Sequence, residues 1–266
     1  MPRQVADKMI FVSGLSLVRR IKAFLIHFVV SLFFAGLSAL LVFRYWYPGA
    51  YREMSGGVDI FTLIVCVDLI LGPLITFVIV NAKKTRRHLL LDISFVAALQ
   101  IFGLSYGLWT AFNARPVYLV FEYHRMAIVH ASDIDLDHLE KYRPEYLKLP
   151  TSGPELLSLR ELSQSEVIES VMHAALGVSQ AAQPNLWQPY GQAKTEILLQ
   201  AKPLTELLAR SPGSKQTEEI HKIIKAKGVP VDRAISLPLL GRKDVWTVII
   251  DSNTAYPVGF VEINTL

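Results

Sequence analysis

The 266-residue chain contains a single cysteine, Cys66, and only 19% of its residues are charged. A lone thiol cannot form an intramolecular disulfide, so each folded part must be stabilised by its own apolar core. The phosphate-binding patterns G-x-x-x-x-G-K-[ST] and G-x-G-x-x-G are also missing. Their absence disfavours a nucleotide-binding enzyme, and we expect no nucleotide cofactor.

The sequence offers no convincing metal site. Its histidines do not follow H-E-x-x-H or a similar ligand spacing. Asp133, Asp135 and Asp137 imitate the start of an EF-hand loop. However, His138 stands where that loop needs glycine and Pro144 where it needs a bidentate glutamate. We expect neither calcium nor another metal to be bound.

A soluble catalytic centre is equally hard to find. The segment from Gly177 to Ala181 lacks the final glycine of a nucleophile elbow and follows a predicted helix instead of a strand. The sequence therefore predicts a protein that is not an enzyme.

What the sequence does contain is long apolar runs, which cover residues 23–43, 60–80 and 89–112. A bilayer core about 30 Å thick is crossed by about 20 helical residues, so each run is long enough to span it once. We predict a three-helix transmembrane domain over residues 1–115. The first run exceeds the roughly 7 to 15 residues of a signal-peptide core, so we expect it to stay uncleaved.

Basic residues give the orientation of the three spans. They cluster before the first run and between the second and third, and the loop between the first and second has fewer. The residues before the first run are Arg3, Lys8, Arg19, Arg20 and Lys22; those between the second and third are Lys83, Lys84, Arg86 and Arg87; and those between the first and second are Arg44 and Arg52. Short basic loops stay in the cytoplasm, so the N-terminus is predicted inside and residues 116–266 outside the cytoplasm.

The charge is divided unevenly between the two parts. Residues 1–115 carry 12 basic and 5 acidic residues (net +7), whereas residues 116–266 carry 15 and 18 (net −3). The basicity of the chain is therefore a topology signal, and we expect membrane lipid but no nucleic acid among its partners.

Residues 116–266 are predicted to form an extracytoplasmic α+β domain. Alternating segments at 117–123 and 126–130, and at 245–250 and 257–263, each predict a β-hairpin, and the two hairpins could share one sheet. Helices are expected between them: one begins at the capping box Ser163/Glu166, one is broken at Pro203, and one ends before Gly228.

Polar groups inside the spans are the candidate site. The second span holds Asp68, Gly72 and Pro73, whose missing N–H should free the carbonyl of Leu69. The third span presents Gln100, Gly103 and Gly107 on one face; the two glycines form a close-approach pattern.

Three interpretations of Asp68 remain open at this point: a structural hydrogen bond to Gln100, a contact to a partner protein, or a proton or ion pathway. An intramembrane aspartyl protease is excluded, because the other candidate acid, Asp92, lies about 14 Å away in depth, whereas a catalytic dyad needs about 3 Å. The predicted cytoplasmic segments are too short for a signalling domain.

Several strings occur in an order that resembles the TfpX/TfpZ family of type IV pilin accessory proteins of Gram-negative bacteria: RIKAFLIH at 20–27, WYP at 46–48, SGG at 55–57, VDLILGP at 67–73, YGLW at 106–109 and ARPVYLVFE at 114–122. The resemblance implies a bacterial inner-membrane protein that binds a cognate pilin and affects its stability or assembly. It also implies that other pilus assembly proteins can be partners, and it brings no active-site residues.

A pilin held in the membrane is itself one helix with an exported head. A partner with helices and an exported domain can therefore contact both parts at once. The alternatives are a membrane-anchored ligand-binding subunit and a membrane enzyme or transporter that uses Asp68.

The predicted topology can be tested with single cysteines at Lys84 and Ser214 in a Cys66→Ser background. A membrane-impermeant thiol reagent applied outside the inner membrane should label position 214 and spare position 84. The opposite labelling pattern would overturn the orientation.

Overall fold

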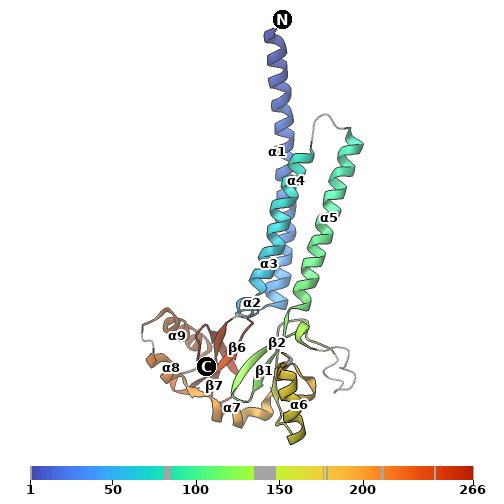
Figure 1. Cartoon of the computed structure of the whole chain (residues 1–266). Helices are drawn as coiled ribbons and strands as arrows, with labels where there is room; N and C mark the ends of the chain where they lie inside the picture. The colour runs from blue at the N-terminus through green and yellow to red at the C-terminus, as the bar shows by residue number, and fades with distance from the viewer. Residues whose placement is uncertain are drawn as a thin grey trace. The chain divides into compact units, whose positions relative to one another are not determined.

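The computed structural model describes residues 2–80, 85–134, 148–175, 177, 179–210, 213–242 and 244–265. The chain forms two compact units (Figure 1). The first comprises residues 1–44 and 58–112, and the second comprises residues 45–57 and 113–266. Lys83 and Lys84 of the basic loop, and most of the EF-hand-like segment from Asp135 onward, lie outside the described residues.

The first unit confirms the prediction of three helices long and apolar enough to cross a membrane, at Leu17–Trp46, Gly57–Ile79 and Arg86–Asn113. In terms of elements, the first is α1 (Pro2–Leu41) with a π-helical turn at Val42–Trp46, and the third is α5 (Arg86–Asn113). The second is continuous through α3 (Gly57–Cys66), a π-helical turn at Val67–Leu71 and α4 (Gly72–Ile79). Figure 1 shows α3 and α4 running alongside α1.

The second unit is an α+β domain, as predicted, built on an eight-stranded mixed sheet in its described part. Its strands run in the order β4-β3-β1-β2-β6-β7-β8, and β5 pairs with β6 beside β2. Their bounds are β1 Pro116–Glu122, β2 Arg125–His130, β3 Glu155–Leu159, β4 Trp187–Pro189, β5 Lys202–Pro203, β6 Ala234–Leu240, β7 Val245–Asp251 and β8 Pro257–Val261.

The two predicted hairpins are confirmed, and they do share this sheet. β1 and β2 pair antiparallel around a turn in which Tyr123 has φ +59°, and β7 and β8 pair antiparallel as well. The hairpins meet where β2 pairs parallel with β6. Asp251 sits at the β7 turn, where its carboxylate accepts hydrogen bonds from the N–H of Asn253 and the guanidinium of Arg233.

The described helices of this unit are α2 Tyr51–Met54, α6 Gln164–Ala175, α7 Lys194–Gln200, α8 Leu204–Arg210 and α9 Lys215–Lys227, together with several short 3₁₀ turns. One half of the capping box predicted before α6 is present: the Ser163 N–H donates to the Glu166 carboxylate at 2.9 Å, and the Ser163 hydroxyl donates to the same carboxylate. Hydrogen bonds from Arg160 and Ser163 hold the pKa of Glu166 far below its usual range. α9 ends at left-handed Gly228, as predicted, and the Ser214 side chain caps its N-terminus.

The two faces of the sheet bury different apolar clusters, because side chains alternate along each strand. One face carries Leu119 and Phe121 of β1 with Leu237 of β6. On the opposite face, Val120 belongs to a cluster over β1 to β4, and Ala234 belongs to a separate cluster under α8 and α9. Pro203 is expected to interrupt one helix. In the structure residues 202–203 form a short strand that separates two helices, α7 and α8.

The loop between the first two membrane helices is part of the core of the second unit. The Met54 side chain is 1% exposed and belongs to the cluster that contains Phe121 and Leu237. The Met54 carbonyl accepts a hydrogen bond from the N–H of Arg242 at 2.9 Å. Tyr47 is fully buried, and burial raises its pKa to about 12 although Arg242 and Arg115 act in the opposite direction.

We predict that Met54→Ala lowers the free energy of unfolding of the second unit by about 2 to 5 kcal/mol, because it removes a buried side chain from a packed core. Pulse proteolysis of the full chain in detergent and urea measures this loss. The matched control is Met172→Ala on α6, where the side chain is 61% exposed and the change should stay within about 0.5 kcal/mol. Equal effects of the two substitutions would mean that the loop does not contribute to this core.

Candidate functional site in the membrane helices

The second membrane helix contains a π-helical turn at Val67–Leu71, directly before Gly72 and Pro73. In such a turn the backbone hydrogen bonds span five residues instead of four. In π-helical spacing the N–H five residues ahead would donate to the Asp68 carbonyl, but that residue is Pro73, which has no N–H. The Asp68 carbonyl is therefore without its backbone donor. In lipid, such a group must find a partner within the protein.

Gln100 of α5 supplies that partner. Its Nε2 donates to the Asp68 carbonyl at 3.1 Å. A hydrogen bond between Asp68 and Gln100 is one of the three interpretations that the sequence leaves open, and Pro73 is expected to free the carbonyl of Leu69. In the structure the two spans are joined through the main chain of Asp68, because the π-helical turn shifts the freed position by one residue.

His27 of α1 extends this contact to the first span. Its Nε2 lies within hydrogen-bond distance of Gln100 Oε1, and its Nδ1 lies 2.6 Å from Thr76 Oγ1. A neutral imidazole satisfies both contacts when Nε2–H donates to Gln100 and Nδ1 accepts from the Thr76 hydroxyl. Side chains from all three spans thus form one hydrogen-bonded chain, which we call the intramembrane polar chain: Thr76, His27, Gln100 and the Asp68 carbonyl.

Gly72 makes room for this arrangement. It is buried together with Pro73 and Thr76, and a Cβ at its position would overlap the Gln100 amide. Gly72 is needed for the close approach of Gln100 to the second span.

The two glycines of α5 differ in their surroundings. A Cβ on Gly107 would lie 2.6 Å from Ile64 Cγ1, so Gly107 packs closely against the second span. A Cβ on Gly103 would meet nothing within 4 Å among the described residues. Of the two glycines in the predicted close-approach pattern, Gly107 therefore packs against the second span, whereas the space beside Gly103 is open.

The carboxylate of Asp68 takes no part in the intramembrane polar chain. It makes no hydrogen bond or ion pair with any described residue, and the residue is only partly buried. A carboxylate in the bilayer raises the insertion free energy by about 2.5 to 3.5 kcal/mol unless something compensates it. The second span thus presents a carboxylate that accepts no hydrogen bond from a described residue, and on which His27 acts electrostatically.

His27 is the residue that sequence reasoning missed, although a histidine inside an apolar run is itself a signal for a buried polar contact. No group of three or more histidine, cysteine or acidic side chains that could hold a metal occurs among the described residues. Chemically, the cluster is suited to helix packing and hydrogen bonding.

Comparison with known proteins gives a consistent set of relatives. The family described as "Fimbrial assembly protein FimB" matches residues 15–56. "Fimbrial assembly protein, serogroup I" of Dichelobacter nodosus is 34% identical over 230 residues, which cover 86% of this chain and 89% of that protein. The serogroup E1 protein of the same organism is 33% identical over 232 residues, with 86% and 88% covered. No solved structure matches the chain.

We predict that Gly72→Ala destabilises the full chain in detergent, because the new methyl group must displace Gln100 from the Asp68 carbonyl. Interhelical hydrogen bonds in membranes contribute about 0.6 to 2 kcal/mol, and the loss should fall in that range. Thermal unfolding in detergent measures it, and Gly103→Ala is the matched control because open space surrounds that position. A G72A protein as stable as G103A would show that Gln100 does not stabilise the helix packing.

Proposed function

Because the chain belongs to the family of fimbrial assembly proteins, we propose that it assists the assembly of a type IV pilus by binding a pilin within the membrane. The observation that carries this proposal is the 34% identity to a fimbrial assembly protein over 86% of the chain. Its finer assignment to the TfpX/TfpZ pilin accessory proteins rests on the sequence strings given above and is part of the proposal. So are an effect on pilin stability and contacts to other pilus assembly proteins.

The Asp68 carboxylate, to which no described residue donates a hydrogen bond, supports a helical partner. A pilin helix that brings a hydrogen-bond donor or a cation to Asp68 would offset the unfavourable burial of that carboxylate. Gly103 supports the same interpretation. Along α5 it lies between Gln100 and Gly107, which both contact the second span, but the space beside Gly103 itself is open and could receive a partner helix. Docking at these positions would leave the intramembrane polar chain intact.

We further propose that the protein lies in the inner membrane with its N-terminus in the cytoplasm and the α+β domain in the periplasm. The clusters of basic residues before the first span and between the second and third support this orientation. The shared core of residues 45–57 and 113–266 also agrees with it, since three crossings put both segments on one side.

The test is a chromosomal deletion in a type IV piliated host, complemented with the wild type, Asp68→Asn or Asp68→Leu. Deletion should reduce surface pili and twitching without blocking pilin processing. Asn should restore more than Leu, because Asn keeps hydrogen bonding to a partner, and the interaction of about 0.6 to 2 kcal/mol makes the loss partial.

Two further measurements keep this test specific. Gly103→Leu should reduce co-purification of the pilin in detergent at an unchanged level of the accessory protein. Normal piliation in a deletion strain with one pilin gene would refute the proposed function. Equal loss with Asn and Leu at normal protein levels would instead indicate that the Asp68 carboxylate handles protons.

A further inference from the structure

The sheet of the second unit is interrupted along one side of β6. On that side β5 pairs with Ile235 and Ser236, and β2 pairs with Leu239 and Leu240. Between these two pairings, neither strand pairs with Leu237 or Pro238. Pro238 has no N–H and so brings no unsatisfied donor to this interruption.

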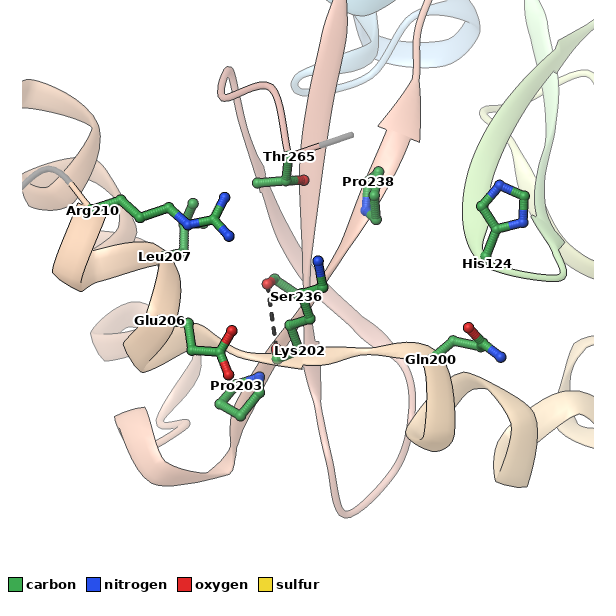
Figure 2. A pocket seen from close by; sticks show the side chains of 10 residues that line it. All are labelled: His124, Gln200, Lys202, Pro203, Glu206, Leu207, Arg210, Ser236, Pro238 and Thr265. Atoms are coloured by element: carbon green, nitrogen blue, oxygen red, sulfur yellow. Dashed lines mark hydrogen bonds between the residues drawn. The ribbon is translucent and has the colours of Figure 1, made fainter.

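A cavity of about 260 Å³ opens at this interruption (Figure 2). Leu207, Pro203 and Pro238 provide apolar walls, and the buried Ser236 is also part of its lining. Figure 2 shows the side chains of Lys202 and Arg210 extending from β5 and α8 toward the strand that carries Ser236 and Pro238. His124, from the turn between β1 and β2, lies across from them.

Lys202 and Arg210 differ from three arginines of the sheet region, each of which pairs with a carboxylate. Arg125, Arg160 and Arg233 each form an ion pair with a carboxylate, at 2.8, 2.5 and 2.7 Å. Neither Lys202 nor Arg210 forms an ion pair within the part of the chain that the structure describes. Two unpaired cations therefore converge on a concave site in a domain whose sequence carries a net charge of −3.

We propose that this cavity binds an acidic side chain of an extended peptide segment in a partner protein. Lys202 and Arg210 would hold the carboxylate, while Leu207, Pro203 and Pro238 would contact the aliphatic part of the same side chain. Charge-assisted hydrogen bonds to carboxylate are strong enough to select it over a neutral amide of the same shape.

Glu206 narrows the choice of ligand. It lines the cavity on the same helix as Arg210, and Figure 2 shows its carboxylate beside Pro203. It can accept a hydrogen bond from a peptide N–H, but it repels a second negative charge. The site is therefore suited to a single carboxylate on a peptide and poorly suited to a polyanion or to phosphate.

This inference does not depend on the role in pilus assembly, because it rests on the cavity and its charges alone. The experiment uses the full chain in detergent with a fluorescein-labelled, terminally blocked peptide that contains one glutamate, and a matched peptide with glutamine in its place. Fluorescence anisotropy at low salt measures both affinities. The glutamate peptide should bind about tenfold more tightly, as expected for one charge-assisted hydrogen bond pair.

Variants then locate the site. Lys202→Gln and Arg210→Gln should each weaken glutamate-peptide binding by about fivefold to tenfold, Glu206→Gln should strengthen it, and the exposed Lys222→Gln on α9 should leave it unchanged. Unchanged melting temperatures exclude unfolding as the cause. Equal affinity for the two peptides, no effect of Lys202→Gln and Arg210→Gln, or displacement of the peptide by equimolar inorganic phosphate would each overturn the proposal.

Discussion

The packing of the membrane unit depends on one carbonyl group that a proline leaves without a donor. Pro73 removes the N–H that the π-helical turn would direct at Asp68, and hydrocarbon offers no water to replace it. Gln100 provides the hydrogen bond at 3.1 Å, and His27 and Thr76 in turn satisfy the remaining polar atoms around Gln100. Gly72 is small because Gln100 must reach across it. A single missing N–H thus accounts for polar residues on all three helices.

The same arrangement separates two roles that the sequence assigns to one residue. The main-chain carbonyl of Asp68 accepts the hydrogen bond that joins two helices of the unit, whereas its carboxylate takes no part in that contact. A residue whose backbone is fixed and whose carboxylate has no hydrogen bond to a described residue is well suited to an intermolecular contact, because binding a partner requires no rearrangement of the helices. This is why the carboxylate and the intramembrane polar chain can be tested by different substitutions.

Local signals made much of the fold predictable. The apolar runs predict the three helices. Helix-end signals, such as Ser163 with Glu166 before α6 and Gly228 after α9, involve residues close together in the chain, so they are visible in the sequence. β5 is different: its two residues are extended because they pair with β6, and no pattern in the sequence records that pairing. The contact of His27 with Gln100 depends on helix rotation and depth, which apolar composition does not specify. Of the candidate site, the sequence therefore provides the residues but not their hydrogen bonds.

The burial of residues 45–57 in the second unit has a consequence for the order in which the chain can fold. Met54 is synthesised before two of the membrane helices, yet its carbonyl bonds to Arg242, near the end of the chain. Contacts between such distant segments form slowly, because a long loop must close before they bring any stabilisation. Until β6 and β7 are made, the cluster that buries Met54 lacks Leu237 and Trp246, so this loop is incompletely covered. A product that ends before β6 therefore lacks part of the core around Met54, and proteases should recognise it by this incompletely buried loop.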